Sequence, residues 1–290
     1  MRPSPTPRPS SASTGPGYLL HSASPDPPVA APLTVIAAIP ARYGSTRLPG
    51  KPLLPISGRP MIEHVYRRVG LARGLARIVV LTDDERIARA VEAFGGEVEM
   101  TPADCASGTD RIAHAARRWP ATAAVVNVQG DEPLIDPEAV SAIAAHLAAH
   151  PEDPVVTLAA PLGGGSAQAA ADLANPNVVK VVLGASGHAL YFSRAAIPYA
   201  RQQGGGAAAL RHLGIYGYQR AALLRLAGLS PTPLERTEAL EQLRALENGI
   251  SIRVLVRAGS QPGVDTREDL ERVERMIEEA AGAMAPLAAD

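Results

Sequence analysis

From Thr34 onward, short apolar runs alternate with longer segments whose apolar residues recur every three or four positions. A short run rich in Val, Ile and Ala predicts a buried strand, whereas the longer spacing predicts a helix with one buried face. The predicted strands are Val35–Ile39, Ile78–Thr82, Glu97–Met100, Ala124–Val128 and Val155–Ala159. The predicted helices between them are Met61–Ala72, Glu85–Phe94, Asp110–Trp119 and Pro137–His150. This alternation predicts an α/β fold around a mostly parallel sheet with right-handed crossovers.

After Ala160 the regular alternation ends. The predicted elements are paired strands Val178–Leu183 and Ala189–Phe192, a linker Gln202–Ala209 rich in Gly and Ala, strand Leu213–Tyr218, helices Leu223–Leu226 and Arg236–Leu246, strand Ile252–Val256 and helix Glu268–Glu279. We interpret residues 33–290 as one α/β domain. A small insertion, about residues 178–220, is expected to cap the sheet and to supply a dimer surface.

The first 32 residues follow neither pattern. They are dense in Pro, Ser and Ala, and such a segment buries too little apolar surface to offset its chain entropy. We therefore predict a disordered tail, or a start codon assigned too far upstream. The segment lacks the apolar core of a signal peptide. No apolar run in the chain approaches the roughly 18 residues that span a bilayer, so no membrane insertion is expected.

Charge and cysteine content narrow the class of protein. The formal net charge is −1 over 290 residues, without the basic excess typical of proteins that bind nucleic acid. Cys105 is the only cysteine, so no internal disulfide can form, which suits a reducing cytoplasm. We expect a cytoplasmic protein with no nucleic-acid partner.

The loop after the first predicted strand carries Arg42, Ser45, Arg47 and Lys51. Open α/β sheets bind phosphorylated ligands at the carboxyl ends of their strands. The only other lysine is Lys180, and every remaining basic residue is arginine. A compact ammonium retained in this loop favours a polyphosphate site, although a solvated lysine retained by chance is the alternative. The loop is not the Gly-x-x-x-x-Gly-Lys-[Ser/Thr] loop of many nucleoside triphosphatases.

Two carboxylates and one amide follow later strands. Gln129 and Asp131 come after the fourth predicted strand, and Asp265 precedes the last helix. A carboxylate at a strand end is a natural Mg²⁺ ligand when the substrate supplies phosphate oxygens. Simpler interpretations remain open. Asp131 is a common type of turn residue after a glycine, Asp265 or Thr266 is a candidate helix cap, and the amide of Gln129 can bond either a strand end or a base edge.

The helix that precedes Trp119 begins near Ser107. Its N-terminus is able to bind an anion or a ribose hydroxyl, although capping by Thr109 or Asp110 is the default interpretation. Cys105 has no base beside it in the sequence, so we interpret it as a small packing residue rather than a nucleophile.

Further polar candidates lie in the second half of the chain. His212 and Tyr216 are four apart on a predicted strand and share one face, either as a packed pair or as a substrate-binding pair. Arg194 follows an apolar strand, and Glu241 and Gln242 are adjacent in a predicted helix. Solvation is the ordinary state of these last three side chains.

Together these segments resemble the 3-deoxy-manno-octulosonate cytidylyltransferase family, the CMP-KDO synthetases. The matching segments occur in order and cover nearly everything after residue 33; they are Ile39–Lys51, Thr82–Asp84, Ser107–Arg111, Val126–Pro133, Asn175–Lys180, Leu190–Arg194, His212–Tyr218, Leu240–Arg244 and Gly263–Thr266. The first segment is shared loosely with other cytidylyltransferases. The His212–Tyr218 and Leu240–Arg244 segments are more particular to this family.

The resemblance implies a nucleotide-diphospho-sugar transferase fold, which is Rossmann-like, together with a homodimer and Mg²⁺. It also implies that CTP and 3-deoxy-D-manno-octulosonate (KDO) give CMP-KDO and pyrophosphate, for lipopolysaccharide assembly in a Gram-negative cytoplasm.

The resemblance also implies residue roles by position. The implied catalytic residues are Arg42, Lys51, Asp131 and Asp265, of which Asp131 and Asp265 bind the metal. The implied CTP contacts are Ala41, Arg42, Ser45, Lys51, Ser107 and Gln129, with Arg47 shaping the loop. The implied sugar-acid contacts are Arg194, His212, Tyr216, Glu241 and Gln242. Lys180 is expected to serve the structure or the rim of the site.

The chain departs from the family at three places. Cys105 stands where the family usually has histidine, the stretch between Arg194 and His212 is short and rich in Gly and Ala, and the first 32 residues have no counterpart. Two other functions remain as alternatives: a synthetase for another CMP-sugar acid, and an inactive nucleotide-binding paralogue. A dinucleotide-dependent oxidoreductase is disfavoured because no Gly-x-Gly-x-x-Gly follows the first strand.

Overall fold

The computed structural model of the chain describes residues 1, 33–44, 48–162, 167–201, 209–259 and 263–284. The predicted disordered tail and most of the predicted linker at Gln202–Ala209 lie outside the described residues. Among the described helices, none is both long enough and apolar enough to cross a membrane.

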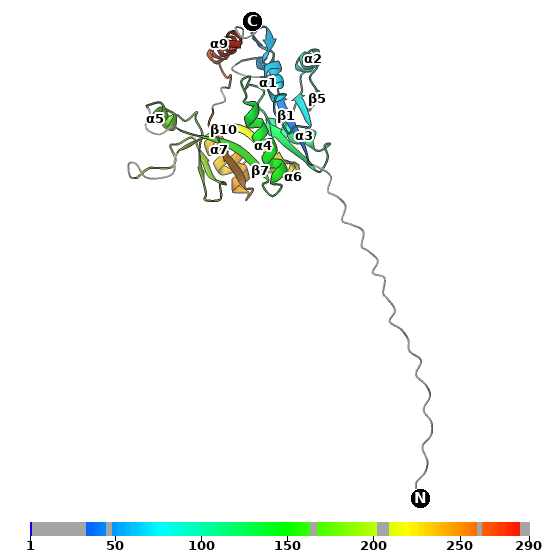
Figure 1. Cartoon of the computed structure of the whole chain (residues 1–290), viewed down its shortest axis with the longest axis vertical. Helices are drawn as coiled ribbons and strands as arrows, with labels where there is room; N and C mark the ends of the chain where they lie inside the picture. The colour runs from blue at the N-terminus through cyan, green and yellow to red at the C-terminus, as the bar shows by residue number, and fades with distance from the viewer. Residues whose placement is uncertain (2–32, 45–47, 163–166, 202–208, 260–262, 285–290) are drawn as a thin grey trace. The chain divides into compact units, whose positions relative to one another are not determined.

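A twisted central sheet organises the fold (Figure 1). Its strands are β11 (Ile252–Val256), β7 (Val155–Pro161), β10 (Leu210–Gln219), β6 (Ala123–Asn127), β1 (Thr34–Ala41), β4 (Arg77–Thr82) and β5 (Val98–Met100), in that spatial order. All neighbouring pairs on this path are parallel except the two that involve β10, which runs antiparallel to both β6 and β7. The predicted α/β fold with a mostly parallel sheet is therefore confirmed.

An antiparallel ribbon extends the sheet beside β10. The strands β8 (Lys180–Leu183) and β9 (Ala189–Ser193) pair with each other, and β8 also pairs with β10 through Leu210 and Val181. The predicted pairing of these two strands is confirmed. The predicted insertion at residues 178–220 includes β10, which is a central strand of the main sheet, and β8 and β9 extend that sheet from β10.

Helices cover both faces of the sheet because the strand side chains alternate between the two faces. In β1, Val35, Ala37 and Ile39 pack on one side, and Ile36 and Ala38 on the other. The first side is covered by α1 (Met61–Val69), α2 (Glu85–Ala93) and α4 (Pro137–Ala149). The second side is covered by α3 (Gly108–Ala116), α6 (Arg220–Ala227) and α8 (Gln242–Glu247).

A smaller apolar cluster fastens the C-terminal helix to the domain. Leu270 and Val273 of α9 (Arg267–Met284) pack with Ile56 and Met61. Ile56 belongs to a short hairpin formed by β2 (Pro55–Ile56) and β3 (Arg59–Pro60), which follows the 3₁₀ helix η1 (Lys51–Leu53). Neither the hairpin nor α5 (Ala167–Ala174) was expected from the sequence pattern.

The predicted helix Arg236–Leu246 is wrong as a single element. Ala239 adopts a left-handed conformation with φ of 50°, which ends α7 (Pro233–Glu238) before α8 begins. A buried ion pair between Arg244 and Glu235 then ties the two short helices together. Because of the break, Glu241 and Gln242 stand at the N-terminus of α8 instead of the middle of a helix.

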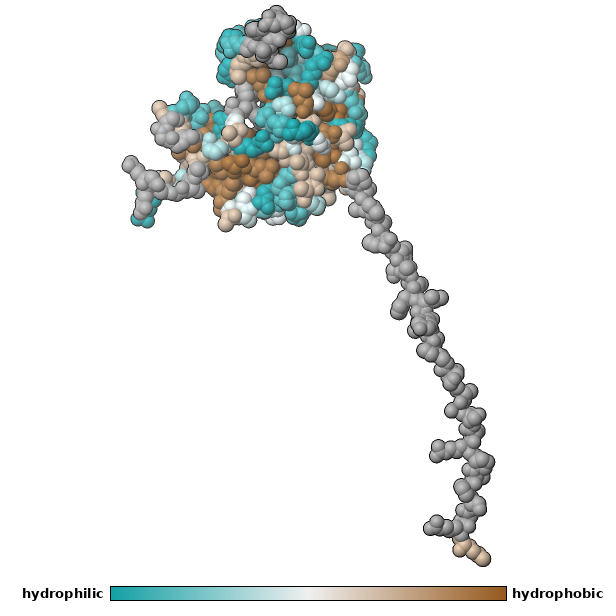
Figure 2. All heavy atoms as spheres, viewed as in Figure 1, coloured by the Kyte–Doolittle hydropathy of each residue, from teal (hydrophilic) through white to brown (hydrophobic). Residues whose placement is uncertain are grey.

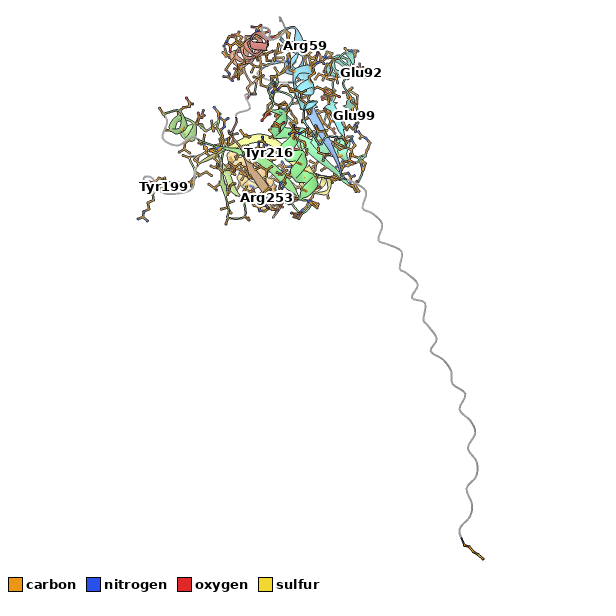
Figure 3. All side chains as sticks on the ribbon, in the orientation of Figure 1. Arg59, Glu92, Glu99, Tyr199, Tyr216 and Arg253 are labelled. Atoms are coloured by element: carbon orange, nitrogen blue, oxygen red, sulfur yellow. The ribbon has the colours of Figure 1, made fainter. Side chains whose placement is uncertain are left out.

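Large apolar side chains are exposed at a few positions on the domain. They include Leu190 on β9 and Tyr199, which are 65% and 89% exposed. Figure 2 shows brown apolar areas between the teal polar ones on the face in view. In Figure 3 Tyr199 lies at the edge of the domain, far from Tyr216 in the sheet.

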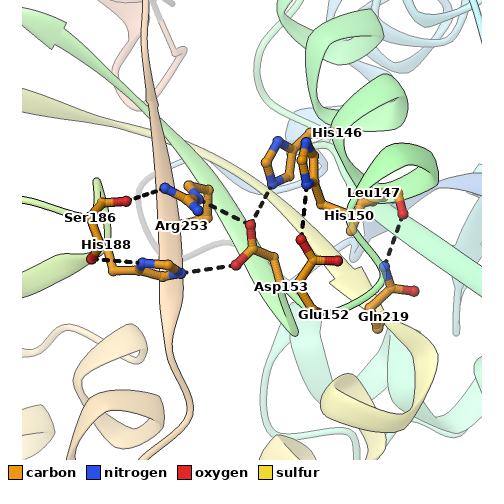
Figure 4. A network of polar contacts seen from close by, with 9 residues as sticks. All are labelled: His146, Leu147, His150, Glu152, Asp153, Ser186, His188, Gln219 and Arg253. Atoms are coloured by element: carbon orange, nitrogen blue, oxygen red, sulfur yellow. Dashed lines mark hydrogen bonds and ion pairs between the residues drawn. The ribbon is translucent and has the colours of Figure 1, made fainter.

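A buried carboxylate joins three elements at the amino end of β7 (Figure 4). Asp153 accepts hydrogen bonds from Nε2 of His146 on α4 at 2.8 Å and Nε2 of His188 at 2.9 Å, and from Nε of Arg253 on β11 at 3.0 Å. Burial alone raises the pKa of this carboxyl, but the hydrogen bonds from His188, His146 and Arg253 outweigh it and lower the pKa to about 2. The network fastens the β8–β9 turn, which contains His188, to the sheet.

We predict that Asp153→Asn lowers the free energy of unfolding by about 2 kcal/mol at pH 7. The folded pKa of about 2 lies below the unfolded value of 3.8, so this stability is fully present above about pH 5. It is lost as the pH falls toward 2, with about half remaining at pH 3. Urea denaturation of both proteins between pH 7 and pH 3 measures the difference.

Glu152→Gln is the matched control, because the Glu152 side chain is 67% exposed and forms an ion pair with His150, next to the Asp153 contacts. Its effect should stay within about 0.5 kcal/mol. A loss in Asp153→Asn that is equal at pH 7 and pH 3 would contradict the ionised network.

Candidate active site

A cavity of about 690 Å³ opens at the carboxyl ends of β1 and β6. It is lined by Pro40, Ala41, Arg42, Gly44, Lys51, Pro52, Cys105, Ser107, Gly108, Arg111, Gln129, Gly130, Asp131 and Asp265. The structure thus brings together seven residues that the sequence singled out as site candidates: Ala41, Arg42, Lys51, Ser107, Gln129, Asp131 and Asp265. Ser45 and Arg47 lie outside the described residues.

Lys51 lies at the centre of this cluster. Its ammonium donates hydrogen bonds to Oδ2 of Asp131 at 2.6 Å, to the carbonyl of Val264 at 2.8 Å and to Oδ1 of Asp265 at 3.3 Å. The side chain is only 14% exposed, so these charged contacts are partly shielded from water. Lys51 therefore has specific partners, and the interpretation as a solvated lysine is wrong.

Asp131 is positioned by the close approach of two strand ends. A Cβ atom on Gly130 would lie 2.9 Å from the carbonyl oxygen of Pro40, so only glycine fits where the chain leaves β6 beside β1. The backbone carbonyl of Asp131 then accepts a hydrogen bond of 2.9 Å from the amide of Val264. This contact brings the segment that carries Asp265 to the same edge of the sheet.

The side chains of Thr266 and Asp269 form the cap of α9. The hydroxyl of Thr266 accepts from the amide of Asp269 at 3.2 Å, and the Asp269 carboxylate accepts from the amides of Asp265 and Thr266. The alternative role of Asp265 as the helix cap is therefore filled by Thr266 and Asp269. The Asp265 carboxylate faces Lys51 instead.

Ser107 is the N-cap of α3. Its hydroxyl accepts from the amide of Asp110 at 3.1 Å, while the Asp110 carboxylate accepts from the amide of Ser107 at 3.1 Å. The cap was expected at Thr109 or Asp110, so the predicted position is corrected by two or three residues. Ser107 both caps the helix and borders the cavity. The N-terminus of α3 therefore adjoins the cavity, and a helix N-terminus favours a bound anion.

Arg111 was not among the residues that the sequence pattern singled out. This residue is 3% exposed, yet it borders the cavity. Its guanidinium bonds the hydroxyl of Thr101 and lies 3.3 Å from Oδ1 of Asp83. The signal was present, because Asp83 and Arg111 both fall in segments that match the family. Cys105 also borders the cavity, but burial raises the pKa of its thiol, which disfavours a nucleophilic thiolate.

Glu132 is a second residue that the sequence did not single out. Its side chain is buried beside Asp131, and Oε2 has no hydrogen-bond partner among the described residues. Burial, with a smaller contribution from the charge of Asp131, raises the pKa of this carboxyl to about 8.

A second cavity of about 140 Å³ adjoins the first, and Gln129 borders both. Its lining is Thr109, Asn127, Gln129, Val155, Tyr216, Tyr218, Leu226, Glu241, Gln242, Ala245 and Ile252. Three predicted sugar-acid contacts meet here, namely Tyr216, Glu241 and Gln242. The hydroxyl of Tyr216 is buried and has no hydrogen-bond partner among the described residues (Figure 3 shows the position of Tyr216).

His212 packs behind Tyr216. Their ring centroids lie 5.2 Å apart, and Nε2 of His212 lies 2.9 Å from the hydroxyl of Thr157. That hydroxyl donates its one hydrogen to the carbonyl of Ile215 at 2.7 Å, so it must accept the hydrogen bond from a protonated Nε2. In a neutral ring Nδ1 is then unprotonated. Burial lowers the pKa of His212 to about 3, so the ring is neutral at physiological pH.

The side chains of Arg194 and Lys180 bond backbone carbonyls in and around the β8–β9 ribbon, and neither residue lines the two cavities. Arg194 donates to the carbonyls of Glu238 and Pro176 at 2.7 and 3.0 Å. Lys180 is fully buried and donates to three carbonyls at 2.6 to 2.9 Å, including that of Arg194. The structure supports a structural role for Lys180. It does not place Arg194 among the residues that line the two cavities.

The donor set limits which metal ion fits the site. Across the described parts of the chain, no group of three or more His, Cys, Asp and Glu residues could hold a metal ion on its own. Asp131 and Asp265 remain as a pair of carboxylates that converge on one cation, the Lys51 ammonium. A pair of this kind suits Mg²⁺, which commonly takes one or two carboxylates together with substrate phosphates.

Comparisons with known proteins agree with this geometry. A family model described as cytidylyltransferase matches residues 36–252. The 3-deoxy-manno-octulosonate cytidylyltransferase of Syntrophotalea carbinolica is 50% identical over 83% of this chain and 98% of its own length. The corresponding protein of Myxococcus xanthus is 48% identical over 85% of this chain and 98% of its own length.

Solved structures give the same answer. A CMP:2-keto-3-deoxy-manno-octonic acid synthetase complexed with CTP matches with a TM-score of 0.79 and 43% identity, over 85% of this chain and 99% of that one. A cytidylyltransferase from Leptospira borgpetersenii, with a TM-score of 0.57 and 19% identity over 85% of this chain and 87% of that one, shares the fold. The resemblance inferred from the sequence is confirmed: the chain belongs to the 3-deoxy-manno-octulosonate cytidylyltransferase family.

Proposed function

We propose that this protein transfers the cytidylyl group of CTP to KDO and releases pyrophosphate, as the names of its relatives indicate. The observation that carries the proposal is the two-part cavity. A larger half with cationic side chains adjoins a smaller half with polar and aromatic side chains, and Gln129 borders both. A nucleotide and a sugar acid need two such neighbouring compartments.

The larger half suits CTP. Arg42 and Lys51 supply positive charge to a triphosphate, and the N-terminus of α3 at Ser107 supplies backbone N–H groups. Gln129 offers an amide to the base edge from the end of β6. Arg111 is a further candidate for a phosphate or base contact, because its buried guanidinium borders this cavity.

The smaller half suits the sugar acid. Tyr216, Glu241 and Gln242 present hydroxyl, carboxylate and amide groups to it, and the unpartnered Tyr216 hydroxyl is a ready hydrogen-bond donor to a substrate oxygen. We assign His212 the role of supporting Tyr216 from behind, as a neutral ring. The proposed contact of Arg194 with the sugar acid requires its guanidinium to leave backbone carbonyls that it now bonds.

Asp131 and Asp265 would hold Mg²⁺, because they already converge on one cation. When bound there, Mg²⁺ supplies positive charge that orients the sugar hydroxyl and lowers its pKa. The protein contributes position and electrostatics. Lys51 and Arg42 stabilise charge on the departing pyrophosphate, and the walls of the cavity align the two substrates for in-line displacement at the α-phosphorus.

Bond changes in the proposed reaction balance without a further reactant. The anomeric oxygen of KDO forms a bond to the α-phosphorus while the bond between the α-phosphorus and the bridging oxygen breaks. The pyrophosphate leaves with the electron pair, and the hydroxyl proton passes to water. We do not assign His212 the role of general base, because its ring packs against Tyr216 and is not among the residues that line the two cavities.

We further propose that the protein works as a homodimer in the cytoplasm, where CMP-KDO enters lipopolysaccharide assembly. The exposed side chains of Leu190 and Tyr199 support a partner surface on the ribbon and the segment that follows it. Sedimentation of the purified protein measures this state directly.

We predict that the wild-type protein releases pyrophosphate from CTP only with KDO and a divalent cation. A panel of sugar acids, including sialic acid and an eight-carbon amino analogue, tests the substrate, with a phosphate-coupled assay as the readout. Chelation of Mg²⁺ with EDTA should abolish turnover, and added Mg²⁺ should restore it. Faster turnover with another acid would assign a different CMP-sugar synthetase activity, and no turnover with any acid would contradict the proposal.

We predict that Asp265→Asn folds normally and lowers kcat by about 100-fold or more, because one anionic ligand of Mg²⁺ is lost. Glu268→Gln is the control, since Glu268 is exposed and lies three residues further along the chain in the first turn of α9. Circular dichroism checks the fold of both variants. Near-normal turnover in Asp265→Asn would overturn the metal assignment.

We predict that Lys51→Met affects both stability and CTP binding, because the ammonium neutralises two carboxylates and also faces the proposed triphosphate site. Without the cation, Asp131 and Asp265 repel each other, so the thermal midpoint should fall when no divalent cation is present and should rise more with Mg²⁺ than in the wild type. The KM for CTP should increase as well. Lys51→Arg should recover little activity, because a planar guanidinium does not replace a compact ammonium between two carboxylates. An unchanged response of the thermal midpoint to Mg²⁺ would contradict this description.

A further inference from the structure

The two described ends of the loop between β1 and η1 are joined beside the cavity. Arg42 stands at one end and Lys51 at the other, and both border the cavity. The amide of Gly50 donates a hydrogen bond of 3.0 Å to the carbonyl of Tyr43. This hydrogen bond joins the backbones of residues 43 and 50, which are the chain neighbours of Arg42 and Lys51.

The ring of Tyr43 packs directly against Gly50. A Cβ atom on Gly50 would lie 2.9 Å from Cε2 of Tyr43 and 3.0 Å from its Cζ, so the ring occupies the space that a side chain would need. Gly50 also has φ of 68°, in the left-handed region that favours glycine. Contact with the ring thus fixes the backbone that precedes Lys51.

Arg86 holds the ring from the side of α2. Its guanidinium carbon lies 3.3 Å from the centroid of the Tyr43 ring, which is a close cation–π contact. The guanidinium is held in turn by Asp84 through hydrogen bonds of 3.0 and 2.6 Å. Asp84 also caps α2 through the amide of Arg86, so the contact is anchored to a helix that packs on the sheet.

We propose that Tyr43 is a positioning residue that sets the separation of Arg42 and Lys51 for the triphosphate, and that Arg86 holds Tyr43 in place. Tyr43 is absent from the lining of the cavity, so it acts through its two neighbours. The inference rests on the proposed function, because it assumes that the cavity binds CTP. It concerns the affinity for the nucleotide and leaves the identity of the sugar acid open.

A purely structural role for Tyr43 predicts a different result. Loss of a packed ring would lower the thermal midpoint, while the folded fraction would bind CTP as before. A positioning role instead raises the KM and the Kd for CTP, with a smaller change in the KM for KDO. Comparison of the change in KM for CTP with the change in KM for KDO therefore distinguishes a positioning role from a structural one.

The experiment compares Tyr43→Leu, Tyr43→Phe, Arg86→Met and the double variant Tyr43→Leu/Arg86→Met. The readouts are kcat, the KM for each substrate, the Kd for CTP from calorimetry without KDO, and the thermal midpoint. Arg89→Met is the control, because Arg89 lies on the same helix, is 68% exposed and pairs with Glu85 instead. The Phe variant keeps the ring and removes only the hydroxyl.

We expect Tyr43→Leu to raise the Kd and KM for CTP by about tenfold and Arg86→Met by about threefold, within the range of a cation–π contact plus lost packing. Tyr43→Phe and Arg89→Met should stay close to the wild type. The double variant should be no worse than Tyr43→Leu alone, since the two residues act as one unit.

The inference is overturned if Tyr43→Leu and Arg86→Met keep the wild-type Kd for CTP, or if the double variant shows the full sum of two independent losses. If Tyr43→Leu does not fold, Arg86→Met still decides the outcome, because it removes the contact that holds the ring and leaves the ring in place. Failure of the proposed function is seen separately, because the wild-type protein would then show no KDO-dependent release of pyrophosphate while the CTP Kd still reports on Tyr43.

Discussion

Lys51 joins three segments that are far apart in the chain. Lys51 lies at the start of η1, which follows β1. Its ammonium contacts Asp131, which follows β6, and also Val264 and Asp265, which precede α9. Each contact is charge-assisted or made to a carbonyl, in a setting only 14% exposed. Without this cation, two carboxylates would face each other at one edge of the sheet. Because both carboxylates point at the same cation, the pair is also suited to Mg²⁺.

This arrangement depends on how closely the strand ends approach. β1 and β6 are neighbouring parallel strands, so their carboxyl ends meet at one edge. The backbone at Gly130 passes so close to Pro40 that a Cβ atom does not fit. The amide of Val264 then bonds the carbonyl of Asp131 and brings Asp265 into place. On the N-terminal side of Lys51, Tyr43 packs against Gly50 and contacts Arg86, so the backbone before Lys51 is also held by close packing.

Much of this could be predicted from the sequence, because strand periodicity and strand-end loops are local features. The five early strands followed from them. The placement of Arg42, Lys51, Asp131 and Asp265 in one site was expected from the resemblance to the family. What failed depended on tertiary contacts. No glycine or proline marks the break at Ala239, and the sequence alone could not decide between capping and site roles for Asp265. Arg111 was missed because its burial appears only when α3 packs on the sheet.

The proposed arrangement places the triphosphate beside Lys51 and a divalent cation between Asp131 and Asp265, within one cavity. A crystal structure of the wild-type protein with CTP and Mg²⁺ tests it most directly. We expect phosphate oxygens within hydrogen-bond distance of Lys51 and Arg42, cytosine near Gln129, and Mg²⁺ bound by at least one of the two carboxylates. CTP bound in another cavity, or Lys51 and both carboxylates without any contact to nucleotide or metal, would contradict it.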